Sequence, residues 1–158
     1  MKKMNVIIIV LDAGRPDYLG CYGFDGGLSP FIDMLASKGV IFKNVTTVAP
    51  WTVPSHASMF TGLYPNQHRA TWNTLCIKKD IKNLFNILEE KGYHSMATVA
   101  NDNLLIPHNH MFSPHTEIFG LTDRKNLEVS GFIDGFSSEE THSDIITDWF
   151  IRWFKQKK

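Results

Sequence analysis

Residues 5–11, NVIIIVL, followed by Asp12, Ala13 and Gly14, decide the fold class that the sequence predicts. A continuous run of β-branched and other apolar residues is typical of a strand buried on both faces, as in a parallel sheet covered by helices. The run ends abruptly at Asp12, so this carboxylate stands at the carboxyl end of the predicted strand. Ligands of open α/β sheets bind at that edge.

Helical and strand patterns alternate along the rest of the chain. Ser29 and Pro30 provide an N-cap and a first-turn proline, and Gly39 provides a stop. Asp80 is the predicted cap of a helix that Gly92 ends. The predicted helices are 30–38, 55–61, 81–91 and 143–154, the further predicted strands are 40–48 and 93–100, and 101–140 is read as loops with short elements. This alternation predicts a doubly wound α/β fold with a mostly parallel sheet and helices on both faces.

Composition limits the class of protein. The chain has 158 residues, 43% of them hydrophobic and 20% charged, as expected of a soluble globular domain. Sixteen basic and sixteen acidic residues cancel, so no overall field favours a nucleic-acid or anionic-membrane partner. The longest apolar run, 6–11, is too short to cross a bilayer. Cys21 and Cys76 are interpreted as reduced thiols of a cytoplasmic protein.

Asp12 is the first candidate for chemistry. A carboxylate at the end of a buried strand is costly unless it is paired or holds a metal ion, which makes Asp12 a candidate metal ligand. Two structural interpretations stay open: Asp12 caps a turn before Gly14, or it pairs with Arg15. Asp17 is read as a partner of Arg15 or as a turn residue.

Thr52 is the second candidate, because it stands between Pro50 and Pro54 where a predicted strand gives way to a helix. A threonine hydroxyl is a weak nucleophile that needs a base or a metal ion to activate it. The free N–H groups at the start of the helix favour a phosphate or sulfate oxygen. The alternative is that Thr52 only caps this helix.

Several histidines follow Thr52. His56 stands on the first turn of the predicted helix and His68 in the loop after Gly62, and either side chain can donate a hydrogen bond to an anionic ester. The structural alternative for both is an ordinary surface or buried histidine. His108, His110 and His115 form a looser cluster without the spacing of two ligands on one helical turn, so they are read as a solvated surface, with a metal contact left open.

Three segments together resemble the N-terminal part of the sulfatases, within the alkaline phosphatase superfamily. They are NVIIIVLDAGRPDYLGCYG at 5–23, SPFIDMLASKGVIFKNV at 29–45 and WTVPSHASMFTGLYPNQH at 51–68, and a weaker resemblance continues to Asn101. The resemblance implies that Asp12 binds a catalytic divalent metal ion (Ca, Zn, Mn or Mg) and that Thr52 is the metal-bound nucleophile. It further implies a small-molecule sulfate or phosphate ester as substrate. His56 and His68 are the expected substrate contacts, because each can donate a hydrogen bond to an anionic ester.

The chain departs from the family pattern at three positions. Thr52 stands where sulfatases proper carry a Cys or Ser that is oxidised to formylglycine, and threonine cannot give that aldehyde. In this it resembles the phosphodiesterase, phosphotransferase and phosphatase members, whose hydroxyl attacks phosphorus directly. Ala13 replaces a second acid, and His56 replaces the usual arginine.

The remaining metal ligands of the family lie on later strands, beyond Lys158. Residues 1–158 are therefore interpreted as the N-terminal portion of a sulfatase-like catalytic domain, incomplete at its C-terminus. An uncovered sheet edge favours self-association. The expected function is metal-dependent ester hydrolysis through a covalent intermediate on Thr52; the alternative is a non-catalytic fragment or partner-binding module without a complete metal site.

Overall fold

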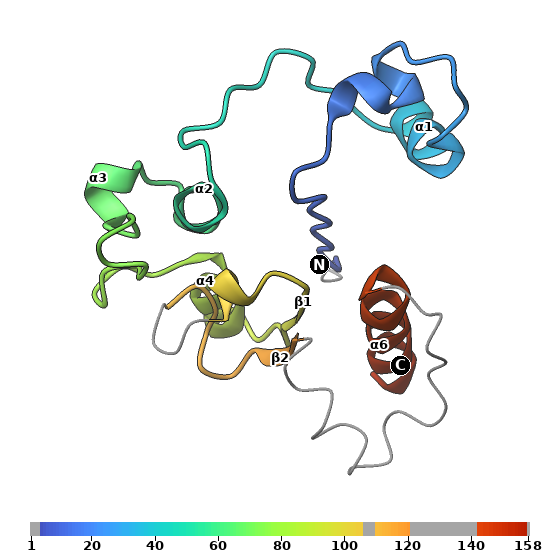
Figure 1. Ribbon diagram of the computed structural model, residues 1–158. Helices are drawn as coiled ribbons and strands as arrows, with labels where there is room; N and C mark the ends of the chain where they lie inside the picture. The colour runs from blue at the N-terminus through green and yellow to red at the C-terminus, as the bar shows by residue number, and fades with distance from the viewer. Residues whose placement is uncertain (1–3, 106–109, 121–141, 158) are drawn as a thin grey trace. The chain divides into compact units, whose positions relative to one another are not determined.

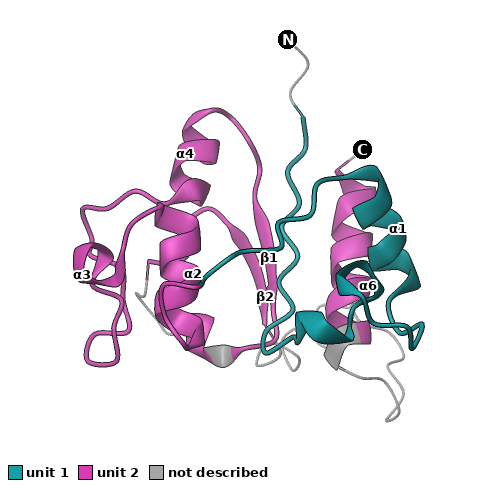
Figure 2. Cartoon of the chain, turned by 90° about the horizontal axis from the view of Figure 1, so that it is seen from above, with its two compact units in different colours: residues 1–46 teal, residues 47–158 magenta. Residues whose placement is uncertain are grey.

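The computed structural model describes residues 4–105, 110–120 and 142–157. The chain divides into two compact units, residues 1–46 and residues 47–158, which Figure 2 shows in separate colours. Each unit is described by itself below.

The first unit is built around the helix α1 (Pro30–Lys38), preceded by the single turns η1 (Pro16–Tyr18) and η2 (Gly20–Tyr22). The carboxylate of Asp33 accepts hydrogen bonds from the backbone N–H of Cys21 (2.7 Å) and from the hydroxyl of Ser29 (3.1 Å). A Cβ at Gly20 would collide with the same carboxylate. These contacts hold η2 against α1, and the predicted helix at 30–38 is confirmed.

The predicted strands at 5–11 and 40–48 are wrong. Both segments lack regular secondary structure, and the side chains from Val6 to Leu11 are 41–77% exposed. A β-branched run adopts a strand only where a neighbouring segment supplies backbone partners and covers its faces. Among the described residues, the two strands that form pair only with each other.

The second unit contains those two strands, β1 (Met96–Val99) and β2 (Glu117–Gly120), which run parallel with Met96 opposite Glu117 (Figure 1). The predicted strand at 93–100 is confirmed as the shorter β1. The loop region predicted from 101 contains η3 (Asp102–Leu104) and β2 as short elements, while 121–141 lies outside the described residues.

Helices flank these strands in Figure 2, with α6 (His142–Gln156) on one side and α2 (Thr52–Thr61) and α4 (Leu84–Glu90) on the other. A short helix, α3 (Pro65–His68), follows α2. The predicted helix at 143–154 is confirmed by α6, and the one at 55–61 by α2, which begins three residues earlier. No helix in the described ranges combines the length and hydropathy of a membrane span.

The core of the second unit forms under the buried face of α2. Val53, Ala57 and Phe60 pack with Ala70, Ile77 and Met111, and each large side chain contributes about 1.5–3 kcal/mol when it is fully buried. Phe60 also meets Phe85 of α4 edge to face, with ring centroids 5.1 Å apart. This packing fixes the position of α2 and of its first residue, Thr52.

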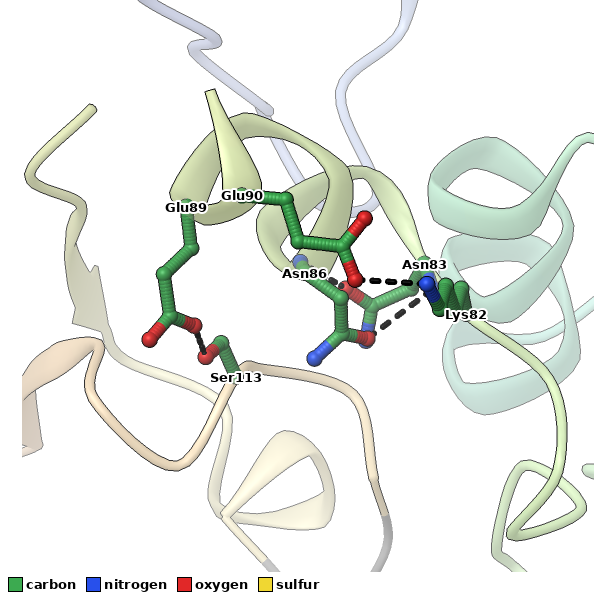
Figure 3. A network of polar contacts seen from close by, with 6 residues as sticks. All are labelled: Lys82, Asn83, Asn86, Glu89, Glu90 and Ser113. Carbon is green, nitrogen blue, oxygen red and sulfur yellow. Dashed lines mark hydrogen bonds and ion pairs between the residues drawn. The ribbon is translucent and has the colours of Figure 1, made fainter. Parts of the chain in front are cut away.

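The helix α4 begins later than the sequence predicts. Its N-cap is Asn83 and not Asp80, because Asn83 and Asn86 exchange reciprocal side-chain to backbone hydrogen bonds of 3.1 and 3.0 Å (Figure 3). The Asn83 amide also donates to the carbonyls of His110 (2.8 Å) and Met111 (3.1 Å). Asp80 instead pairs with Lys78, which lowers the pKa of the Asp80 carboxyl.

The helix α6 covers the strands with Trp149, which is 1% exposed and lies 5.9 Å from the ring of Phe119 in β2. At its far end, Trp153 Nε1 donates to the carboxylate of Glu117 at 2.9 Å, and Lys157 pairs with the same carboxylate at 3.0 Å. These contacts join the C-terminal helix to the first residue of β2.

Candidate functional site

Thr52 is the first residue of α2, directly after the N-cap Trp51, whose backbone is extended. Its side chain is half-buried. Pro54 two residues later suits the first turn, where a missing N–H breaks no helical hydrogen bond. The Trp51 ring packs edge to face on Trp72, with centroids 5.4 Å apart. The start of α2 is therefore a fixed helix N-terminus, at which negative charge is favoured.

Asn101 is a site residue that the sequence analysis missed. It lies two residues past the end of β1, and its Nδ2 group donates to the Thr52 hydroxyl oxygen at 3.3 Å. The Thr52 hydroxyl thus stands beside the carboxyl end of β1, the edge at which α/β proteins bind ligands. The signal in the sequence was a polar side chain directly after a predicted strand.

His56 is buried against its own helix, with 6% of its surface exposed. Its Nδ1 lies 2.9 Å from the backbone oxygen of Thr52. A carbonyl oxygen only accepts, so Nδ1 carries a proton, and in the neutral ring Nε2 is the acceptor. His56 therefore ties the first turn of α2 to its second turn, and its Nε2 donates to an anion only when the ring is protonated.

His68 is fully buried at the end of α3. Its Nδ1 accepts from the backbone N–H of Ala70 at 3.0 Å, so the neutral ring carries its proton on Nε2, which lies 2.9 Å from the Ser58 hydroxyl. Burial lowers the pKa of His68, against a smaller opposing effect of a hydrogen bond to the backbone of Pro54. A contact from His68 to a substrate would have to replace one of these bonds.

Asp12 belongs to the first unit and Thr52 to the second. Asp12 lies in an exposed turn, in which the Gly14 N–H donates to the Leu11 carbonyl at 3.0 Å. Ala13 in that turn has a φ of 57°, in the left-handed region. The predicted pairing of Arg15 with Asp17 is confirmed, with a 3.1 Å hydrogen bond that lowers the pKa of Asp17.

The structure describes two of the three later histidines, and their surroundings differ. His110 is exposed with a φ of 55°, His115 faces the carboxylate of Glu89 at 3.5 Å, and His108 lies outside the described residues. Glu89 also accepts a hydrogen bond from Ser113, as Figure 3 shows.

The family model of the sulfatases matches residues 4–158. The chain belongs to the sulfatase family. It is 37% identical over 144 residues to the multifunctional alkaline phosphatase superfamily protein PehA of Trinickia caryophylli, covering 87% of this chain and 26% of that protein. It is 30% identical over 95 residues to the uncharacterized sulfatase YidJ of Escherichia coli, covering 60% of this chain and 19% of that one. No solved structure gave a significant match.

An arylsulfatase of Clostridium perfringens is 26% identical over 162 residues, covering 99% of this chain and 31% of the relative. This sulfatase chain thus spans about a fifth to a third of the length of these curated relatives. Membership implies an alkaline-phosphatase-like α/β fold, with which the parallel pair β1 and β2 and its flanking helices are consistent.

Members of the sulfatase family generally bind a divalent metal ion. Within 4–105, 110–120 and 142–157, no three His, Cys, Asp or Glu side chains gather in a way that holds a metal ion. Stable sites need three or four protein ligands. The described donors of this sulfatase chain therefore do not fit a metal ion by themselves.

Proposed function

We propose that this chain carries the nucleophile of a sulfate- or phosphate-ester hydrolase, and that Thr52 is that nucleophile. The observation that carries the proposal is the position of the Thr52 hydroxyl at the N-terminus of α2, hydrogen-bonded to Asn101 at the carboxyl end of β1. Family membership supports ester hydrolysis as the reaction class.

The start of α2 suits an anionic substrate. The N–H groups of the first helical turn have no partner within the helix, and the helix dipole is positive at this end. An ester group bound there presents its sulfur or phosphorus to the neighbouring hydroxyl of Thr52. Proximity of this kind supplies a large part of the rate enhancement in group transfer.

The proposed reaction has two steps. The Thr52 oxygen forms a bond to sulfur or phosphorus, the bond from that atom to the ester oxygen breaks, and the alcohol leaves with the proton that Thr52 gives up. Water then attacks the sulfated or phosphorylated threonine, releasing inorganic sulfate or phosphate and restoring the hydroxyl. Both steps use only Thr52, the ester and water, because the described donors do not make a site for a metal ion.

Phosphate is the better supported of the two ester classes. Threonine cannot form the aldehyde on which sulfatases proper depend, and its hydroxyl can attack phosphorus directly. The relative PehA is a multifunctional member of the alkaline phosphatase superfamily, which is a reason to assay this chain with both phosphate and sulfate esters. The arylsulfatase relative supports keeping an aryl sulfate among the substrates.

The supporting residues have separate proposed roles. His56 contacts the anion through Nε2 when its ring is protonated, while Nδ1 stays on the Thr52 carbonyl. His68, the other proposed substrate contact, would act from a buried position behind α2. Asp12 is proposed as one metal ligand, within a catalytic domain of the doubly wound, mostly parallel α/β type.

One observation favours a second candidate function. Because the described residues gather no metal-binding group, a non-catalytic sulfatase-like module that binds a partner is the second candidate. Such a module would bind esters weakly and turn none over.

Turnover by the purified chain separates the two candidates. Aryl phosphate, aryl phosphodiester and aryl sulfate are assayed with Ca²⁺, Mg²⁺, Mn²⁺ or Zn²⁺ added in turn. Thr52→Ser keeps a hydroxyl and is expected to retain turnover, whereas Thr52→Ala is expected to abolish it. Equal rates for Thr52→Ala and the unchanged chain refute Thr52 as the nucleophile; no turnover under any condition supports the non-catalytic module.

A further inference from the structure

We infer that Asn101 is a positioning residue for Thr52: its side-chain amide holds the hydroxyl in one rotamer and stabilises negative charge on the hydroxyl oxygen. The inference rests on the proposed function, because it concerns the same hydroxyl. In this hydrogen bond the Asn101 amide is the donor and the Thr52 hydroxyl oxygen is the acceptor.

The direction follows from the other contacts of the Asn101 side chain. Oδ1 accepts from the backbone N–H of Asn103 at 3.0 Å, which turns the chain into η3. A backbone N–H can only donate, so the atom facing it must be the amide oxygen. The NH₂ group is then the one that faces Thr52, where Nδ2 lies 3.3 Å from Oγ1.

Other contacts fix the backbones of both residues that this hydrogen bond joins. The Asn101 backbone oxygen accepts from the N–H of Leu104 at 3.0 Å, and Leu104 is buried. Thr52 is held by the packing of Val53 and Ala57 in the core. Because these contacts fix both backbones, the hydrogen bond favours the one χ1 rotamer of Thr52 that places Oγ1 next to the Asn101 amide.

The bond also acts on the charge of the hydroxyl oxygen. A donor to Oγ1 stabilises negative charge on that oxygen more than it stabilises the neutral hydroxyl. Charge develops on Oγ1 as the hydroxyl loses its proton during attack. Asn101 therefore assists when the new bond forms, in the manner of a preorganised donor.

Two substitutions separate these effects. Asn101→Ser keeps a side-chain oxygen that can accept from the N–H of residue 103, but it is too short to reach Thr52. Asn101→Asp keeps the size and the acceptor of asparagine, but its carboxylate accepts from the Thr52 hydroxyl and opposes negative charge on Oγ1. Circular dichroism of both variants checks that the fold is retained.

The first readout is the χ1 distribution of Thr52, from three-bond NMR couplings in the 158-residue chain, which needs no turnover. A single rotamer is expected in the unchanged chain and in Asn101→Asp, and averaging over rotamers in Asn101→Ser. Averaging already present in the unchanged chain, or one rotamer retained in a folded Asn101→Ser, overturns the inference.

The second readout is the pH–rate profile for an aryl phosphate, taken in the conditions that give Thr52-dependent turnover. Loss of the donor is expected to lower kcat about 100-fold with little change in KM. For Asn101→Asp, kcat is also expected to begin its rise at a higher pH than it does in the unchanged chain. Full turnover by Thr52→Val refutes the proposed function, whereas loss in Thr52→Val with an unchanged Asn101→Ser refutes the role of Asn101 alone.

Discussion

His68 illustrates how burial changes the chemistry of a single side chain. In the folded chain its pKa is lowered from the ordinary value of 6.5, because burial disfavours the charged ring. Protonation of Nδ1 would also break its hydrogen bond with the Ala70 N–H, because a protonated nitrogen cannot accept. The unfolded chain consequently binds a proton more readily than the folded chain does.

The free energy of unfolding should therefore fall as pH drops through about 6.5, since the state with the higher pKa is the unfolded one. Urea unfolding at a series of pH values between 8 and 5, about the range in which histidine titrates, measures this slope. The His68→Gln variant removes this contribution and should show a shallower dependence. An equal slope in the two proteins would contradict the structural assignment of His68.

Arg69 is held in a backbone conformation that costs free energy. It is the C-cap of α3 with a φ of 67°, and a side chain there crowds the following carbonyl. Arg69→Gly is expected to raise the free energy of unfolding by about 0.5–1 kcal/mol, after allowing for the greater freedom of glycine in the unfolded chain. Arg69→Lys keeps the Cβ and should give no gain, so equal stabilities of the two variants in urea would count against the strain.

At the scale of elements, α4 depends on Asn83, which is 1% exposed. Asn83→Ala removes the N-cap and the two hydrogen bonds from its amide to the carbonyls of His110 and Met111, so we expect a loss of about 2–3 kcal/mol. Asn86→Ala removes only the reciprocal bond and should cost about 0.5–1 kcal/mol. Thermal or urea unfolding measures both. Similar losses for the two variants would show that the buried carbonyl contacts contribute little.

The helices were predicted better than the strands, for a physical reason. Pro30 and Gly39 bracket α1, and Gly62 ends α2 with a φ of 70°, so local signals set these boundaries. A strand depends on a partner distant in sequence. The apolar run at 5–11 carries strong β propensity and still forms no strand. Asn83, which caps α4 in place of Asp80, is also held by contacts with residues 27 and 28 positions away.

The exposed run from Val6 to Leu11 has a consequence for association. Six uncharged residues with high β propensity and without proline or glycine are typical of segments that pair between chains. We expect concentration-dependent self-association in sedimentation velocity, reduced by Ile8→Lys. The matched variant Ile8→Val keeps the propensity and should associate like the unchanged chain. Equal association of Ile8→Lys would assign the contact to another surface.

At the scale of the whole molecule, sequence reasoning identified part of the candidate site. Thr52 and its position at the start of a helix followed from the flanking prolines and from the family resemblance. Asn101 did not, because its approach to Thr52 joins residues 49 positions apart in the chain. His56 and His68 were predicted to contact an anion. The structure shows bonds within their own unit, from His56 to the Thr52 carbonyl four residues earlier and between His68 and the Ser58 hydroxyl.

The most direct test of Thr52 as nucleophile is a search for the covalent intermediate. The chain is mixed with an activated aryl phosphate or aryl sulfate, quenched in acid within the first turnover, digested and mapped by mass spectrometry. We expect one phosphoryl or sulfuryl group on the peptide that carries Thr52, and none in Thr52→Val. A label on another residue, a label that persists in Thr52→Val, or no label with any ester and metal would contradict it.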